Sequence, residues 1–299
     1  TTLSDLERFP LRLNDLVVME IKDHAPEKIV WSSGAEYRIS DLPAVGFSGD
    51  YYHRPAFLHG DWIEFQGCVM HIDPSGKGAD ETAYAIVAHL NGNLFVLEVG
   101  SFREGYTESV LEGLAQAAKR QKVKLILLED QFGQGMLASL LQPYLRNIYP
   151  CTIEPTRSNV QKERRIINAL EPVLNQHRLI MNRSVIEIDS KARENDPVEK
   201  ALAYQLFHQL THITVDKNCL QHDDRLDALA GAVEYWNESL AIDEDRAIKE
   251  RESELWDLEL AAYKGEIEGA LDAKILGIPL DQLQKTGKTG DGWFSLAGK

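Results

Sequence analysis

The sequence lacks several features that would assign the protein to a membrane, a disulfide-bonded secreted class or a repeat family. Its 299 residues contain no uninterrupted apolar run of the about 18 residues that a membrane-spanning helix requires. The N-terminus has no basic segment followed by an apolar one, so we expect no secretory signal. Cys68, Cys151 and Cys219 form neither a CxxC pair nor an even disulfide framework. We therefore expect a non-secreted protein that has no membrane partner and occupies a reducing compartment.

Basic residues are also scarce. The chain has 32 Lys and Arg against 47 Asp and Glu, a net charge of −15, which by itself argues against a nucleic-acid partner. However, residues 234–274 hold 13 acids and 5 bases, a net charge of −8, so the rest of the chain carries −7. Six of the remaining acids are the candidate site residues discussed below, and without them that part has a charge of −1. The acidity is therefore local and does not exclude DNA.

A run of strand-like segments begins near residue 63. Residues 68–72, 83–90 and 94–99 are apolar, and the last two flank Asn91-Gly92-Asn93, whose Asn-Gly pair favours a tight hairpin turn. Residues 125–128 are entirely apolar, as in a central strand covered on both faces. These segments predict a sheet that contains both a hairpin and a buried strand.

Helical patterns alternate with the later strands. Ser109 and Glu112 have the spacing of a capping box, and Asp196-Pro197 is typical of a helix start. The order predicts an α/β fold, a mixed sheet with flanking helices. We expect three regions: an extended N-terminal arm or linker, a domain, and an acidic helical tail with a flexible C-terminus, at 1–62, 63–240 and 241–299. The expected helices are 109–118, 135–145, 160–174, 196–210 and one from 224, with a further strand at 151–154.

Carboxylates stand at the ends of the best-defined elements. Asp73 follows the first strand, Glu129 follows the buried strand, and Asp224 and Asp227 share one face at the start of the last helix. An acid at a strand end or a helix start is often only a cap, but acids on three separate elements, two strands and a helix, favour a metal site. Hard oxygen ligands suit Mg²⁺ or Mn²⁺, and two such ions can activate water against a phosphodiester. Asp130 and Asp223 are possible extra ligands.

Three segments carry a resemblance to a known family. They read DPSGKGADETA at 73–83, LLEDQFGQG at 127–135 and HDDRLDAL at 222–229. Together they resemble the nuclease domain of large terminase subunits of tailed bacteriophages, in particular the podophage DNA maturase type. That resemblance implies an RNase H-like fold and the cutting of concatemeric double-stranded DNA during genome packaging. It covers roughly residues 63–240.

The resemblance also implies roles for particular residues. Asp73 matches the first-strand metal ligand, Glu129 the central-strand acid and Asp227 the helix acid, while Asp224 matches a position that is His or Asp in relatives. Asp73 would bridge two Mg²⁺ or Mn²⁺ ions, Glu129 would hold one of them, and the two helix acids would complete the other. The nucleophile would be a water activated by metal. The family also implies a portal or prohead, a small terminase subunit and an N-terminal ATPase domain as partners, in the host cell cytoplasm.

Two clusters of basic residues are candidate phosphate contacts, although a solvated helix face would explain either cluster alone. Two alternatives to a packaging nuclease remain open: a docking module for portal or motor with vestigial nuclease motifs, and a junction resolvase that prefers branched DNA. GQGMLA at 133–138 and the histidines at 208 and 212 match dinucleotide and zinc-protease patterns only in part. The candidate DNA-binding residues are Lys119, Arg120, Lys122, Arg157, Lys162, Arg164 and Arg165.

Overall fold

The computed structural model describes residues 8–74, 81–129 and 135–276. The chain forms two compact units, Thr1–Ser239 and Leu240–Lys299. All the described strands belong to the first unit, and a long helix, α8 (Asp224–Leu276), begins there and continues into the second. No helix in the described part of the chain is both long and apolar enough to span a membrane. The first unit contains the candidate site.

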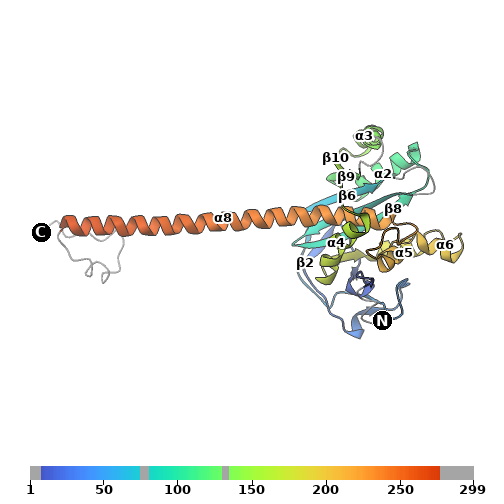
Figure 1. Ribbon diagram of the computed structural model, residues 1–299, viewed down its shortest axis with the longest axis horizontal. Coiled ribbons are helices and arrows are strands. Elements are labelled where there is room, and N and C mark those ends of the chain that lie inside the picture. Colours follow the sequence, from blue (N-terminus) through green and yellow to red (C-terminus); the bar gives the residue numbers. More distant parts are fainter. Residues whose placement is uncertain (1–7, 75–80, 130–134, 277–299) are drawn as a thin grey trace. The chain divides into compact units, whose positions relative to one another are not determined.

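The centre of the main sheet is an antiparallel meander extended by parallel strands. β6 (Gly67–Asp73), β7 (Thr82–Leu90) and β8 (Asn93–Phe102) pair in sequence, and β9 (Leu125–Glu129) runs parallel to β6 on its other side. β10 (Thr152–Thr156) adds in parallel beyond β9. Figure 1 shows these strands at one end of the first unit, with α2 and α3 beside β9 and β10.

Four short strands complete the other side of this nine-stranded sheet, in the order β10-β9-β6-β7-β8-β11-β1-β4-β3. β11 (Leu179–Asn182) pairs in parallel with β8, and β1 (Val17–Met19) pairs in parallel with β11. β4 (Tyr52–His53) and β3 (Arg38–Ile39) form the far edge. The fold class expected from the sequence, a mixed α/β sheet with flanking helices, is confirmed.

The N-terminal segment, up to residue 62, contributes buried residues and strands to the fold, although its irregular composition predicted an extended arm. Leu11, Leu13 and Leu16 are fully buried, and β2 (His24–Val30) and β5 (Phe57–Glu64) pair as a separate two-stranded ribbon. The segment expected to be an extended arm or linker thus packs on this chain's own sheet, through β1, β4 and β3. The boundary proposed at residue 62 remains a prediction.

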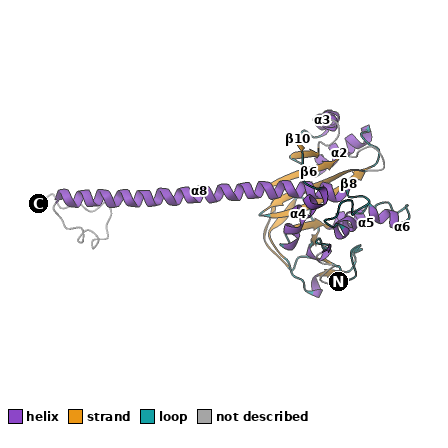
Figure 2. Ribbon diagram, in the orientation of Figure 1, coloured by secondary structure: helices purple, strands orange, loops and turns teal. Residues whose placement is uncertain are grey.

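Helices cover both faces of the sheet (Figure 2). One face packs its apolar side chains, such as Met70 and Ile72, against Leu114 and Leu141 of two helices. The opposite face lies against the start of α8, where a side chain at Gly231 would collide with the ring of His71. The remaining helices are α2 (Glu108–Arg120), α3 (Met136–Ile148), α4 (Lys162–Asn175), α5 (Arg183–Ser190), α6 (Val198–Ala203) and α7 (Leu206–His212), with short 3-10 turns η1 (Leu13–Asp15) and η2 (Ala35–Tyr37).

Sequence patterns that depend on backbone geometry alone predicted the structure correctly. Patterns that depend on which groups a side chain contacts did not. The hairpin at Asn91-Gly92 is confirmed, with positive φ angles of 50° and 80° at the two residues, as a tight turn requires. The capping box at Ser109 and Glu112 is wrong, because α2 begins one residue earlier and its N-cap residue is Thr107. The helix expected over 196–210 is broken into α6 and α7, and β11 and α5 had no counterpart in the prediction.

Candidate metal centre

Three of the predicted acids meet at one point of the first unit. One carboxylate oxygen each from Asp73, Glu129 and Asp227 lies within 4.8 Å of the other two. Among the residues that the structure describes, this is the one group of three such ligand atoms. All three residues are nearly buried, with exposed fractions of 9%, 5% and 0%. Buried carboxylates that face one another either raise one another's pKa or demand a positive charge between them.

The sheet and α8 bring these acids together. β6 and β9 are parallel with Ile72 opposite Leu128, so the residues that follow, Asp73 and Glu129, end neighbouring strands at the same edge. Asp227 comes from the first turn of α8, the helix that covers this face of the sheet. The carboxyl ends of adjacent parallel strands are a common place for functional sites in α/β proteins.

Two basic side chains of α4 enter the cluster. Nζ of Lys162 lies 3.0 Å from Oδ2 of Asp227, 2.9 Å from Oδ1 of Asp223 and 3.8 Å from Oδ2 of Asp73. The guanidinium of Arg165 donates to Oδ1 of Asp227, and its NH2 lies 3.8 Å from Oε1 of Glu129. The cluster therefore contains an internal positive charge, which is still smaller than its negative charge.

The electrostatics show that acids are in excess. Burial raises the pKa of Asp73 well above its ordinary value, and the charges of Asp227, Glu129 and Asp224 add to that shift while Lys162 opposes it. Burial disfavours the ammonium of Lys162, yet the surrounding carboxylates, Asp227 first, raise its pKa. An added cation would relieve this repulsion. A donor set of carboxylate oxygens suits a hard divalent ion such as Mg²⁺ or Mn²⁺.

The remaining predicted acids take different positions. Asp223 joins the cluster through Lys162, whereas Oδ2 of Asp224 accepts a 3.5 Å hydrogen bond from the backbone N–H of Glu81. Asp224 therefore lies at the margin of the three converging acids. Asp130 falls outside the described residues. The assignments of all these residues to metal remain predictions.

The predicted DNA-contacting residues do not form one surface. Arg120 binds Glu98 and Lys122 binds Asp23, on the side where Nζ of Lys124 contacts the carbonyl of Gln66, just before β6. Glu129 lies at the other end of β9, roughly 13 Å away for a strand of this length. Lys119, Arg120 and Lys122 are therefore at the sheet edge opposite the acids.

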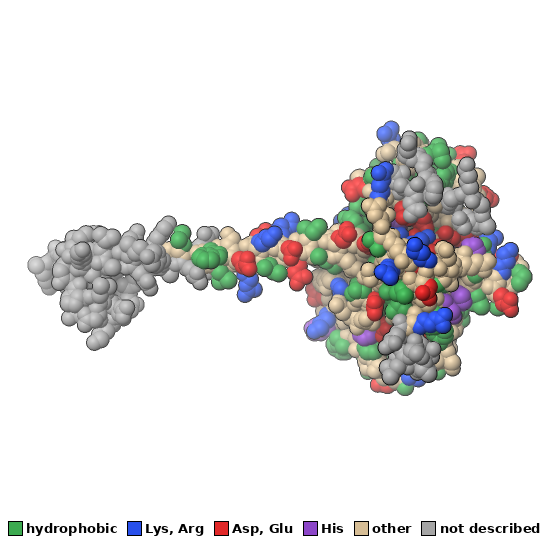
Figure 3. Space-filling view, viewed as in Figure 1, with side chains coloured by type: hydrophobic (Ala, Val, Ile, Leu, Met, Phe, Trp, Pro, Cys, Tyr) green, Lys and Arg blue, Asp and Glu red, His purple; other side chains and the backbone are tan. Residues whose placement is uncertain are grey.

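Arg157 and Arg164 are exposed and flank the beginning of α4, on the same side of the sheet as the acids. A cavity of about 400 Å³ adjoins the acids there, lined in part by Glu129, Arg157 and Arg165. On the visible face of the first unit, basic and acidic side chains are interspersed and do not form a single basic patch (Figure 3).

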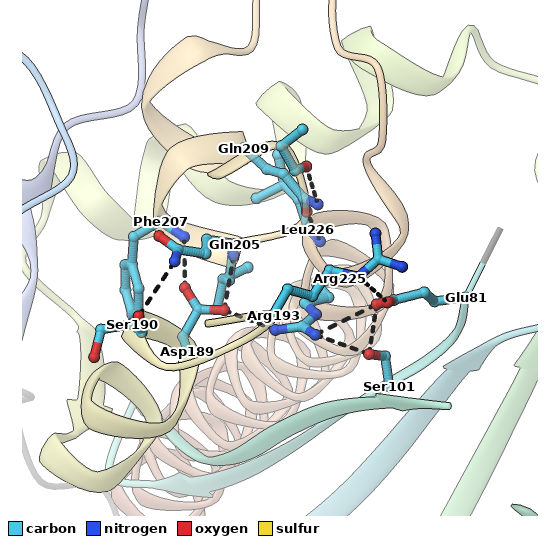
Figure 4. Close-up of polar contacts among 12 residues, drawn as sticks. Glu81, Ser101, Asp189, Ser190, Arg193, Gln205, Phe207, Gln209, Arg225 and Leu226 are labelled. Carbon is cyan, nitrogen blue, oxygen red and sulfur yellow. Dashed lines mark hydrogen bonds and ion pairs between the residues drawn. The ribbon is translucent and has the colours of Figure 1, made fainter. Parts of the chain in front are cut away.

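A second buried charge cluster, which sequence reasoning missed, anchors the same turn of α8 (Figure 4). Arg225 donates from NH1 to Oδ1 of Asp189 at 3.0 Å, and from NH2 to Oε2 of Glu81 at 3.3 Å and Oγ of Ser101 at 2.9 Å. Asp189 also accepts the backbone N–H groups of Leu206 and Phe207. No local pattern marks these residues, because Glu81 and Arg225 are 144 positions apart in the sequence.

Comparisons with known proteins found a family model that matches part of the chain. Residues 72–179 match the family described as the ribonuclease H-like domain of the bacteriophage T7 terminase. Over these residues the chain is similar to that ribonuclease H-like domain. The family resemblance drawn from the three sequence motifs is thereby confirmed. The matched segment includes Asp73, Glu129, Lys162 and Arg165, whereas Asp227 lies beyond it.

Relatives extend the match over more of the chain. The large terminase subunit of Enterobacteria phage T3 is 37% identical over 242 residues, which are 81% of this chain and 41% of that protein. The chain thus spans less than half the length of this relative. Two solved nuclease domains are also similar: that of the human cytomegalovirus terminase (13% identity, TM-score 0.41, 56% of this chain and 82% of that one) and that of the large terminase subunit of bacterial virus Sf6 (16%, 0.35, 58% and 89%).

Proposed function

We propose that this chain is a metal-dependent endonuclease that cuts concatemeric double-stranded DNA during phage genome packaging. The convergence of Asp73, Glu129 and Asp227 within 4.8 Å carries this proposal. The similarity of residues 72–179 to a terminase ribonuclease H-like domain supports the reaction class, and the phage T3 relative supports the packaging role.

The residues of the site would have different roles, in binding metal or in positioning the metal ligands. Asp73, Glu129 and Asp227, with Asp224 at their margin, would hold two Mg²⁺ or Mn²⁺ ions. Bound divalent ions would supply a nucleophilic water and neutralise the leaving oxygen of the phosphodiester. Arg165 holds Glu129 and Asp227 in place through ion pairs. No protein general base is required.

Contacts with DNA would come from the side of the sheet that carries the acids. Arg157 and Arg164 are exposed there and could hold phosphates on either side of the cut. A single pair of such contacts, on a chain with a net charge of −15, predicts weak DNA binding that weakens further as salt is added. By resemblance, firm engagement would depend on the ATPase domain, the small terminase subunit and the portal or prohead in the host cell cytoplasm.

Incubation with supercoiled plasmid tests the proposal. We expect nicked and linear products with Mn²⁺, none with EDTA, and none with Asp73→Ala, because one of the metal ligands is lost. Asp243→Ala, which removes an exposed acid from the second unit, is the matched control and should cut as the unchanged chain does. Circular dichroism should show that Asp73→Ala remains folded.

Two outcomes would favour the alternatives. Absence of cutting by the unchanged chain at every protein concentration would support a docking module with vestigial motifs. A strong preference for branched over linear DNA would support a junction resolvase. Full cutting by Asp73→Ala in Mn²⁺ would contradict the metal site itself.

A further inference from the structure

Two histidines that the proposed nuclease site does not use line a cavity beside α7. His208 and His212 are about one helical turn apart, and their rings stack with centroids 4.1 Å apart and planes inclined by 13°. Both rings line a cavity of about 510 Å³, together with Cys219 and Asp216 of the loop between α7 and α8. Imidazoles at positions i and i+4 of a helix share one face and are a known pair of Zn²⁺ ligands. The cavity therefore brings imidazole, thiol and carboxylate groups to one place.

The two imidazoles are in a form that can bind metal. Nδ1 of His212 lies 2.9 Å from the carbonyl oxygen of His208. When Nδ1 donates to a carbonyl, Nε2 carries the lone pair that a metal requires. Burial, followed by the charge of His212, lowers the pKa of His208 to about 4, so its ring is uncharged at neutral pH. Nδ1 of His208 is buried and lacks a hydrogen-bond partner among the described residues, so no bond at that atom opposes metal binding.

Cys219 offers a third ligand from the loop that follows α7. Its Sγ accepts the backbone N–H of Thr214 at 3.3 Å and donates to the carbonyl of the same residue at 3.5 Å. Both are weak contacts, because sulfur is a weak donor and a weak acceptor. The thiol and the two imidazoles do not meet within 4.8 Å, as the three acids of the other site do. Metal binding would therefore turn the side chain of Cys219 towards the histidines, at the cost of two weak contacts.

The residue between the two histidines shows that a metal here would be structural. Gln209 stands where the zinc-protease pattern has its glutamate, and an amide cannot act as a general base. Gln209 is 1% exposed; its Oε1 accepts the backbone N–H of Leu226 at 3.0 Å, and its Nε2 donates to the carbonyl of Ala203 at 3.2 Å (Figure 4). α7 is thus joined to the first turn of α8, and a metal held by α7 and the following loop would reinforce that connection.

We propose that His208, His212 and Cys219 form a second metal site, which takes one Zn²⁺ and leaves its fourth position to water. Imidazole and thiolate ligands suit Zn²⁺, whereas the carboxylates of the other site suit Mg²⁺ or Mn²⁺. The thiol of Cys219 would lose its proton to solvent as the sulfur–zinc bond forms. The ion would stabilise the loop that leads into α8, and this role does not depend on nuclease activity.

Titration with Co²⁺ in excess Mg²⁺ tests the site, because Mg²⁺ competes for carboxylate oxygens but not for imidazole or thiolate. One equivalent of Co²⁺ should give the strong visible absorption of a tetrahedral ion and a thiolate charge-transfer band, and Zn²⁺ should abolish both. Cys219→Ser should lose the charge-transfer band, whereas Cys151→Ser, a control at another half-buried cysteine, should retain it. His208→Ala and His212→Ala should each lower the Co²⁺ affinity about tenfold or more. His59→Ala, at an exposed position of β5, should not.

A measurement on the unchanged chain guards against misfolding of the histidine variants. Zn²⁺ should slow the alkylation of Cys219 by iodoacetamide and leave that of Cys151 unaffected, as followed by mass spectrometry of the digested chain. Absence of the visible Co²⁺ absorption, or equal affinity in both histidine variants, would overturn the inference. Equal alkylation of Cys219 with and without Zn²⁺ would also overturn it. These results are independent of plasmid cutting in Mn²⁺, which tests the nuclease proposal by itself.

Discussion

Two clusters of buried charge share the first turn of α8, and they differ in their balance. In the first, Asp227 joins Asp73 and Glu129 opposite Lys162 and Arg165, and acids outnumber bases. In the second, Arg225 lies between Glu81 and Asp189, and two further arginines, at 103 and 193, also contact Glu81. Arg193 also pairs with Asp196, so three arginines face three acids. Both clusters join elements that are distant in sequence.

The difference shows how charge balance distinguishes a cluster that stabilises the fold from one that is suited to bind a cation. In a balanced buried cluster each charge has a partner of opposite sign. Removal of one member lowers the stability of the fold, because it leaves another charge buried and unpaired. An unbalanced one is strained without an added cation and is therefore suited to bind one. In this protein the balanced cluster fixes the start of α8 and so places Asp224 and Asp227, whereas the unbalanced cluster is the one that we propose to bind metal.

The largest effect should come from breaking the balanced cluster. Arg225→Met leaves Glu81 and Asp189, which are 1% and 4% exposed, without their shared partner. We expect a loss of about 3–5 kcal/mol in the free energy of unfolding, measured by urea denaturation. Arg246→Met, which breaks an exposed pair with Asp243, is the control and should cost under about 1 kcal/mol. A loss as small for Arg225→Met would show that the cluster does not anchor α8.

Neutralising a member of the unbalanced cluster should instead increase the free energy of unfolding. Burial and the charges of Asp227, Glu129 and Asp224, against the opposing Lys162, raise the pKa of Asp73 in the folded chain. A raised folded pKa gives stability that is present below the unfolded value and is lost as pH rises. In EDTA at neutral pH, Asp73→Asn should therefore be more stable than the unchanged chain, by about 1 kcal/mol.

Thermal unfolding between pH 4 and pH 8 measures this difference. The stability advantage of Asp73→Asn should grow as pH rises and shrink towards acid pH. Added Mn²⁺ should stabilise the unchanged chain and leave the variant unaffected. A variant that is less stable than the unchanged chain in EDTA at every pH would mean that Asp73 serves the fold.

The smallest effect should come from the exposed rim of the balanced cluster. Nε of Arg103 lies 3.2 Å from Oε1 of Glu81, but its side chain is 52% exposed. Arg103→Gln should cost under about 1 kcal/mol, because water screens the pair and Arg225 still holds Glu81. A urea midpoint shift as large as that of Arg225→Met would contradict the view that burial, more than the number of ion pairs, makes this cluster strong.

The sequence predicted the central strands and the acids of the site for one physical reason. Apolar runs such as 125–128 have few alternatives to a buried strand, and the polar residue that ends such a run must lie at the sheet edge. Asp73 and Glu129 were located in this way, and the Asn91-Gly92 turn followed from backbone geometry alone. The short strands β1, β3, β4 and β11 lack that signal, since two to four residues carry no period.

The contacts of the basic residues could not be predicted from the sequence around them. Lys162 and Arg165 were assigned to DNA because they belong to a basic cluster that was expected to flank the acids of the site. The structure turns both towards the acids, since α4 packs beside the start of α8 and Arg165 meets Asp227 across 62 positions of sequence. Lys119 and its neighbours carry similar charge but lie at the opposite sheet edge.

What the sequence by itself determined is therefore the class of the fold, the family and the acids at the ends of β6, β9 and α8's first turn. The fold class and the positions of the acids follow from local patterns, because hydrophobic period and turn chemistry act between residues close in the chain. The family follows from the resemblance of three sequence motifs. Only the tertiary structure decided which cations enter the acid cluster and that Glu81, Asp189 and Arg225 hold α8 in place. Such choices depend on contacts between distant segments, where burial makes each unmatched charge costly and no local signal records the partner.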